Sequence, residues 1–229
     1  MPTDNSGDAA PVLKRVAVYI DGFNLYHAID EIGRPHLKWL DLMALAKSLL
    51  RKNEDLVKVA YFSAYATWLP GPYNRHLAYT AALRLAGVEL HMARFKEADA
   101  SCRKCGATWK SHEEKETDVH VALTILEDAL DDSFDRAIII SADSDYVPVV
   151  RKVRQRRPEK EVFLAIPPKR FSRARDLVKV CTGNFQIPAS RVEMCLLPAV
   201  VSDANGAIVA RRPAQYDPPP AVDDLKTWP

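Results

Sequence analysis

Short apolar, β-branched runs alternate with helix-patterned segments along most of the chain, and this alternation constrains the fold more than any other feature. We expect strands at residues 16–20, 57–65, 88–95, 136–141 and 161–166. The helical patterns between them include LDLMALAKSLL, PYNRHLAYTAALRLAG and TDVHVALTILEDAL. Alternating β and α units predict an α/β fold around a mostly parallel sheet. The continuously apolar run RAIII is typical of a strand that is covered on both faces.

The composition fits a cytoplasmic protein with one principal domain. The chain has 229 residues, of which 48% are hydrophobic and 27% are charged. Its net charge of +2 creates no global basic field, so any site for a polyanion must be local. No apolar run approaches the roughly 18 residues of a membrane span, and the first residues lack the pattern of a signal peptide. We therefore expect no membrane partner.

The sequence pattern divides the chain into a domain and two tails. Residues 1–13 have the composition of a flexible tail, and residues 14–198 carry the alternating pattern of the domain. A segment with a Cys-x-x-Cys pair interrupts that pattern at residues 99–113. Residues 199–229 are rich in proline and in small or charged residues, without sustained periodicity. We expect this C-terminal segment to be a flexible tail that is available to a protein partner.

Acidic residues stand where the predicted strands end. Asp21 follows the strand at 16–20, and Asp143 and Asp145 follow the strand at 136–141. Active sites in open parallel sheets form beyond the carboxyl ends of the strands. If these two strands are neighbours, Asp21 meets Asp143, and Asp145 joins them from the next turn. Asp118 lies near the start of a predicted helix, where the helix dipole tolerates a carboxylate facing the sheet edge.

Carboxylates arriving from three separate segments have the chemistry of a site for Mg²⁺ or Mn²⁺. Such an ion can generate hydroxide and stabilise the oxygens of a phosphodiester during hydrolysis. Asn24 offers an amide that could orient Asp21 or the substrate. Each residue also has a structural alternative, because Asp and Asn commonly cap helices and form turns. Adjacency of the strands decides between the two interpretations.

Three segments together resemble one known family. VYIDGFNLYH, EEKETDVHVALTILEDA and IIISADSDYVPVVRKVR are similar, over about residues 14–182, to the NYN domain family, the LabA-like branch of the PIN-like nuclease superfamily. The resemblance implies a PIN-like, three-layer α/β/α fold with an acidic, divalent-metal-dependent ribonuclease centre. The family's acidic and amide positions fall on Asp21, Asn24, Asp118, Asp143 and Asp145. This chain differs from many relatives at Ala142, where they have glycine, and at Thr124, where they have a further acid.

The segment SCRKCGATWKSHEEKE carries the Cys-x-x-Cys pair, Cys102 and Cys105. Two thiolates at this spacing, followed by glycine, can hold one zinc ion, which usually takes four ligands. His112 and His91, or the same pair from a second copy, are the candidate completions. A pair of free thiols or a redox pair is the alternative.

Basic residues gather after the last two predicted strands of the domain. We expect RNA binding from them as a group: Arg151, Lys152, Lys169 and Arg170. Basic side chains beside exposed aromatic rings can hold phosphates and stack unpaired bases. The alternative is an ordinary solvated helix surface.

Three classes of function fit these observations. The favoured one is a metal-dependent ribonuclease that hydrolyses RNA phosphodiester bonds. The second is a non-catalytic RNA-binding or regulatory module, which the missing acid at Thr124 favours. The third is a metal-dependent phosphatase, although the chain lacks a Walker-type glycine loop and a DxDxT motif. A homo-oligomer is compatible with each of them.

Overall fold

A computed structural model describes residues 13–220, and its centre is a seven-stranded sheet with the order β4-β3-β2-β1-β5-β6-β7. Residues 1–12 and 221–229, which belong to the expected tails, lie outside the described residues. The strands are β1 (Lys14–Asp21), β2 (Glu54–Ala64), β3 (Glu89–Ser101), β4 (Thr108–Lys115), β5 (Arg136–Ile140), β6 (Glu161–Ile166) and β7 (Gly183–Gln186). All neighbouring pairs are parallel except β3 and β4. The expected mostly parallel α/β sheet is confirmed.

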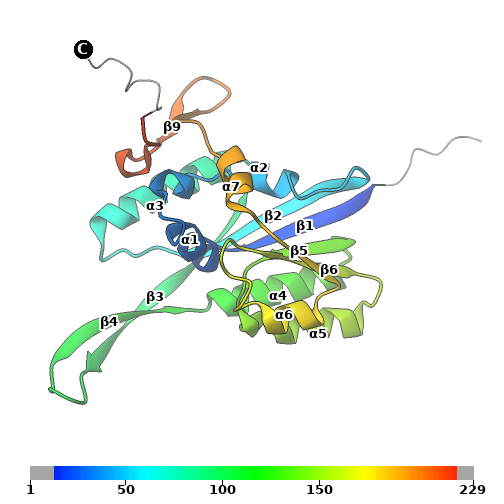
Figure 1. The fold of residues 1–229 in the computed structure, drawn as a ribbon, viewed down its shortest axis with the longest axis horizontal. Helices are drawn as coiled ribbons and strands as arrows, with labels where there is room; N and C mark the ends of the chain where they lie inside the picture. Colours follow the sequence, from blue (N-terminus) through cyan, green and yellow to red (C-terminus); the bar gives the residue numbers. More distant parts are fainter. Residues whose placement is uncertain (1–12, 221–229) are drawn as a thin grey trace, which may run out of the picture.

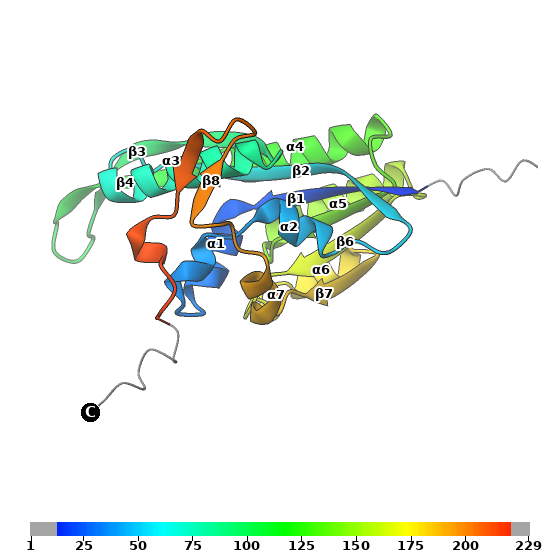
Figure 2. The ribbon, with the colours of Figure 1, turned by 90° about the horizontal axis from the view of Figure 1, so that it is seen from above.

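Helices cover both faces of this sheet, as Figures 1 and 2 show. One face carries α1 (Gly22–Asp30), α2 (Leu42–Lys47), α3 (Pro70–Leu85) and α7 (Ala189–Met194). The other carries α4 (Thr117–Leu130), α5 (Val147–Arg156) and α6 (Arg175–Val180). Short 3-10 helices are η1 (Pro35–Lys38), η2 (Ser144–Tyr146) and η3 (Ala214–Tyr216). None of the helices within residues 13–220 is long and apolar enough to cross a membrane.

The alternation of side chains along β1 builds a core on each face. Val16, Val18 and Ile20 pack toward α1 and α2, whereas Ala17 and Tyr19 pack toward α4 and α5. Successive side chains of a strand point to opposite faces, so the next residue, Asp21, falls on the α4 side. The strand therefore directs its terminal carboxylate toward the start of α4.

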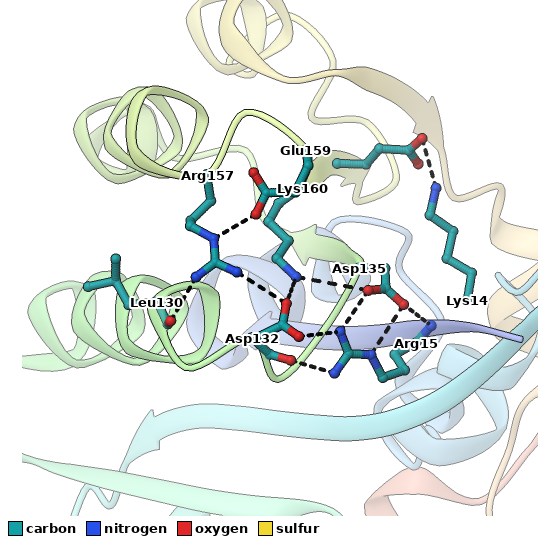
Figure 3. A network of polar contacts seen from close by, with 9 residues as sticks. Lys14, Arg15, Leu130, Asp132, Asp135, Arg157, Glu159 and Lys160 are labelled. Carbon is teal, nitrogen blue, oxygen red and sulfur yellow. Dashed lines mark hydrogen bonds and ion pairs between the residues drawn. The ribbon is translucent and has the colours of Figure 1, made fainter. Parts of the chain in front are cut away.

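A network of charged side chains holds the loops at the opposite end of the sheet (Figure 3). The guanidinium of Arg15 donates to Asp135 (2.7 Å) and to Asp132 (3.1 Å), both in the loop before β5. Arg157 and Lys160, which follow α5, also contact Asp132. These contacts join β1 to the loops that follow α4 and α5.

A buried ion pair joins β2 to β5 near the same end. Arg136 Nη1 lies 2.5 Å and 2.7 Å from the two carboxylate oxygens of Glu54, and both side chains are at most 2% exposed. Glu54 also accepts from the backbone N–H of Arg51 (2.8 Å), and the Arg136 guanidinium stacks on the Phe163 ring. Burial by itself would raise the pKa of Glu54, but the hydrogen bonds from Arg51 and Arg136 bring this pKa below its ordinary value.

The C-terminal segment is structured over a longer range than its composition predicts. Strands β8 (Val200–Ser202) and β9 (Ile208–Arg211) form an antiparallel hairpin, and Tyr216 packs with Trp39 and Ala82. The prediction of a flexible tail from residue 199 is wrong for residues 199–220. These residues bury apolar side chains against α3 and the Trp39 region, which gives a proline-rich stretch enough contact to fold.

We predict that Glu54→Gln lowers the free energy of unfolding by about 3–5 kcal/mol, because it leaves the Arg136 charge buried without a counter-charge. The combined change Glu54→Leu and Arg136→Met should recover most of this loss. Urea unfolding measures both. The matched control is Glu161→Gln, which removes the partially exposed pair with Lys14 and should cost at most about 1 kcal/mol. A Glu54→Gln effect as small as that of the control would contradict the prediction.

Candidate active site at the carboxyl ends of β1 and β5

The predicted adjacency of the two acidic strand ends is confirmed. β1 and β5 pair in parallel, with Ile20 opposite Ile140. The next residues, Asp21 and Ser141, are therefore neighbours, and the Ser141 hydroxyl donates to Asp21 Oδ2 at 2.9 Å. The residue after Asp21 must be glycine, because α1 starts close to β2. A Cβ on Gly22 would lie 2.6 Å from the Phe62 carbonyl oxygen.

A polar cavity of about 390 Å³ opens at this edge of the sheet. Residues from β1, α1, β4, α4 and the loops after β5 and β6 line it. They are Asp21, Phe23, Asn24, His27, Glu31, Glu114, Asp118, Asp143, Arg170 and Arg173. We call it the acidic pocket. It brings together four of the five predicted catalytic residues, Asp21, Asn24, Asp118 and Asp143.

Asp21 is the most enclosed acid of the pocket, with 6% of its surface exposed. Burial raises its pKa to about 6, even though three donors favour its ionised form. These donors are the backbone N–H of Asn24 (3.0 Å) and the hydroxyls of Ser141 and Tyr146. The Asn24 side chain turns the other way and accepts from the backbone N–H of Ala142 at 3.1 Å. Asn24 thus ties the start of α1 to the end of β5.

The Tyr146 hydroxyl lies between two of the carboxylates. It is 2.7 Å from Asp118 Oδ1 and 3.1 Å from Asp21 Oδ2. A phenol has one proton to donate, so the second contact is a hydrogen bond only if one of the carboxyl groups is protonated. Burial, together with the charges of Asp143 and Asp145, raises the pKa of Asp118. Sequence reasoning did not identify Tyr146 as a site residue.

Glu114 is a further acid of the pocket that the sequence analysis missed. It lies on β4, the strand that pairs with β3 in the register Phe95 opposite Glu114. Burial raises its pKa to about 6, and the charges of Asp118 and Asp21 add to the effect. Its Oε1 is buried without a hydrogen-bond partner among the described residues. The signal in the sequence was the acidic run just before α4, four residues from Asp118.

Asp143 and Asp145 take different positions in the turn after β5. Asp143 lines the acidic pocket, and its Oδ1 accepts the backbone N–H of Asp145 at 3.0 Å. Asp145 is exposed and does not line the pocket, but it is close enough for its charge to raise the pKa of Asp118. Of the two acids predicted to act together, Asp143 thus lies inside the pocket and Asp145 lies outside it.

The donor set of the acidic pocket fits a hard divalent cation. Asp21, Glu114, Asp118 and Asp143 offer only oxygen ligands. Within residues 13–220, however, no three His, Cys, Asp or Glu side chains stand close enough together to hold an ion. The Tyr146 hydroxyl, which lies between Asp21 and Asp118, accounts for the spacing of these two acids.

The four predicted RNA-binding residues separate into two places. Arg170 lines the acidic pocket, where it is buried and pairs with Glu31 at 2.8 Å. Lys169 is exposed beside it and donates to the Glu31 carbonyl. Arg151 lines a separate groove with Asp176 and Lys179, and Lys152 is exposed on α5. Arg173, which lines the acidic pocket, was not singled out by the sequence analysis.

The Cys-x-x-Cys pair lies at the tip of the β3–β4 hairpin, which extends away from the body of the molecule (Figure 1). Hydrogen bonds from the backbone N–H groups of Cys105 and Lys104 lower the pKa of the Cys102 thiol. Among the described residues no histidine completes a four-ligand site. His112 pairs with Glu97 and stacks on Trp68, and His91 stacks on Phe62. Completion by His112 or His91 is therefore wrong, because the long hairpin separates them from its tip.

Comparison with known proteins agrees with this architecture. The model of the NYN domain family matches residues 15–188. The chain belongs to the NYN domain family. This membership places it in the PIN-like nuclease superfamily, whose members are usually hydrolases and commonly use divalent metals. The match covers every element that lines the acidic pocket.

Two individual proteins resemble this NYN domain. One is 6-hydroxy-3-succinoylpyridine 3-monooxygenase HspA from Pseudomonas putida, 25% identical over 85% of this chain and 73% of that protein. The other is the crystal structure of a protein of unknown function from Vibrio parahaemolyticus, with a TM-score of 0.53 and 22% identity. That alignment covers 82% of this chain and 99% of the other. The second likeness supports the PIN-like α/β fold.

We predict that Glu114→Gln stabilises the metal-free protein at pH 7.5, by on the order of 2 °C in melting temperature. The folded-state pKa of Glu114 lies above its ordinary value, so its ionised form costs stability above about pH 6. The gain should shrink as the pH falls and vanish near pH 4.5, where the wild-type carboxyl is already protonated. Thermal unfolding in EDTA across this range measures it.

Glu113→Gln is the matched control, because Glu113 is exposed on the same strand and pairs with Lys115. It should not stabilise the protein at any pH in the range. A gain for Glu114→Gln that stayed constant down to pH 4.5 would show that its charge is not the cause.

Proposed function

We propose that this NYN domain is a divalent-metal-dependent ribonuclease of the LabA-like branch, which hydrolyses RNA phosphodiester bonds in the acidic pocket. The observation that supports it best is the convergence of Asp21, Asp118, Asp143 and Glu114 on one open cavity with two arginines. Magnesium or manganese, when bound, would supply a nucleophilic hydroxide and stabilise the charge on the scissile phosphate. We propose a cytoplasmic location and RNA as the partner.

The side chains of the pocket divide this task. Asp21, Asp118 and Asp143 would hold the ion, with Asp145 acting from outside, directly or through water. Ser141 and Asn24 fix the position of Asp21 and of the turn that carries Asp143. Tyr146 holds a proton between Asp21 and Asp118 and would release its contacts when a cation joins the carboxylates.

Two basic side chains of the pocket suit the substrate. Arg170 and Arg173 line the cavity, so a phosphate that enters it meets guanidinium donors as well as the metal-binding acids. Lys169, Arg151 and Lys152 would bind the flanking RNA backbone.

A second candidate comes from the name of the relative from Pseudomonas putida, which records oxidation of a pyridine. One observation favours it: an aromatic-lined cavity of about 190 Å³ adjoins the acidic pocket. Hydrolysis remains the stronger proposal, because the converging acids match the oxygen ligands of Mg²⁺ and Mn²⁺. A non-catalytic RNA-binding module and a metal-dependent phosphatase are outcomes of the test below.

We also propose that the hairpin tip binds structural zinc through Cys102 and Cys105. The lowered pKa of Cys102 favours the thiolate that zinc requires. One chain supplies two of the usual four ligands, so the tip of a second copy would complete the site. This arrangement would make the protein a homo-oligomer.

We predict that Asp143→Asn lowers RNA cleavage at least about 100-fold, because it removes a ligand charge while keeping the shape of the turn. Manganese should raise the melting temperature of the wild type more than that of the variant. Purified proteins are compared on fluorescent single-stranded RNA and on p-nitrophenyl phosphate.

Asp131→Asn, at the exposed far end of α4, is the matched control and should cleave as the wild type does. Equal cleavage by Asp143→Asn would disprove the nuclease assignment. Binding of RNA without turnover would support the non-catalytic module, and turnover of the phosphomonoester alone would support the phosphatase.

For the hairpin we predict one zinc ion per two chains in protein purified without chelator. Cys102→Ser should abolish the zinc and leave a monomer, while RNA cleavage changes less than about 2-fold because the tip lies outside the acidic pocket. Elemental analysis and light scattering measure these quantities. Zinc-free wild-type protein, equal in mass to the variant, would reject the zinc proposal.

A further inference from the structure

A second cavity, of about 190 Å³, lies beside the acidic pocket and has a different lining. Its walls come from α1, η1, the end of β2, α3 and the C-terminal segment. Aromatic rings dominate them: Phe23, Tyr26, Tyr61, His76, Tyr79 and Tyr216. An apolar cavity of about 150 Å³ is enough to bind benzene. We call this the aromatic cavity, and its volume admits a planar ring.

The rings of the aromatic cavity are held in place by contacts of their own. Tyr61 packs edge-on against Tyr79 and His76, with ring centroids 6.2 Å and 6.3 Å apart. The Tyr79 hydroxyl donates to the Leu40 carbonyl at 2.8 Å, and the Tyr61 hydroxyl lies 3.3 Å from His76 Nε2. Fixed rings form a preorganised site, which lowers the entropic cost of binding.

A cationic side chain also lines the cavity. Arg75 contributes a guanidinium to the lining from α3. The other cation of the lining, Lys38, is already paired with Asp30 and Tyr26. Arg75 can only donate, so a fitting ligand combines a planar ring with a carbonyl oxygen or another acceptor.

The two cavities share a wall. Phe23 lines both of them, and Gly22, which lines the aromatic cavity, directly follows the pocket acid Asp21. A molecule that reaches past Phe23 could therefore place a phosphate among the acids and an attached ring among the tyrosines. A nucleotide has both parts, with ring oxygens or nitrogens as acceptors, and unpaired bases stack well on aromatic side chains.

We propose that the aromatic cavity binds one unpaired nucleobase of the RNA whose phosphate lies in the acidic pocket. The inference rests on the proposed ribonuclease function and adds a subsite for base recognition to it. Phe23 separates the base from the phosphate, and Arg75 donates to an acceptor on the ring. The subsite favours single-stranded RNA, because a paired base would first have to break its pairing and stacking to enter the cavity.

Photocrosslinking in EDTA tests this without requiring cleavage. Single-stranded RNA containing 4-thiouridine is irradiated with the protein, and the crosslinked peptides are identified by mass spectrometry. We expect crosslinks in residues 22–29 or 61–79. Ala66→Phe fills the cavity from a half-exposed loop position and should lower these crosslinks at least about 10-fold. Arg75→Gln should lower them as well, without adding bulk.

Arg84→Gln is the matched control, because Arg84 is exposed on the same helix and does not line the cavity. It should crosslink as the wild type does, and circular dichroism checks the fold of every variant. Crosslinks that map elsewhere, or that persist in both Ala66→Phe and Arg75→Gln, would overturn the proposal.

Two further outcomes separate this inference from the proposed function. If wild-type protein crosslinks at the cavity but does not cleave RNA with manganese, the ribonuclease assignment fails and the base subsite stands. If wild-type protein cleaves RNA without such crosslinks, the base subsite fails alone. Binding of free 6-hydroxynicotinate, lost in Ala66→Phe, without RNA crosslinks at the cavity would identify a small heteroaromatic compound as the occupant and would also overturn the proposal.

Discussion

The parallel pairing of β1 with β5 is the constraint on which the site depends. Both strands are buried, so their register is set by the side chains that must face each core. With Ile20 opposite Ile140, the two strands end at the same level, and Asp21 meets Ser141 at the edge of the sheet. A shift of one residue would turn Asp21 toward α1 and α2, away from Asp118. The ion pairs at the other end of the sheet support the same register.

The acids are stable in this position because the protein surrounds them with donors. The backbone N–H of Asn24 and the Ser141 hydroxyl donate to Asp21, and the Tyr146 hydroxyl lies within hydrogen-bond distance of both Asp21 and Asp118. Burial still raises the pKa of Asp21 and Glu114 to about 6, so the ionised carboxylates of the metal-free pocket cost stability near neutral pH. A bound cation would offset this cost. The charge that costs stability in the metal-free protein is thus the charge that would bind the metal.

Much of the fold and of the site could be predicted from the sequence, because both follow from strand periodicity. Asp21, Asp118 and Asp143 stand at strand or helix ends, where position along the chain already determines position in space. Glu114 could not be found this way, because its place depends on the β3–β4 register. The same hairpin carries His112 away from the cysteines, which spacing along the chain did not reveal.

The C-terminal segment was predicted to be flexible from its proline-rich composition, although its sequence contains the pattern of a β-hairpin. Residues 200–211 contain Asn205 and Gly206 between two β-branched runs, a pattern that predicts a hairpin turn. Gly206 has the positive φ of +82° that such a turn requires. The prolines near this hairpin led to the prediction of a flexible tail. Tyr216, which follows the hairpin, lines one side of the aromatic cavity.

The central claim is that the acids at the ends of β1, β5 and α4 form one divalent-metal site. Anomalous diffraction from a crystal soaked in manganese tests it most directly. The account predicts a manganese peak in contact with Asp21, Asp118 and Asp143, with the Tyr146 hydroxyl displaced from at least one carboxylate. A fully soaked crystal with no peak in the acidic pocket, or with manganese bound only elsewhere, would contradict it.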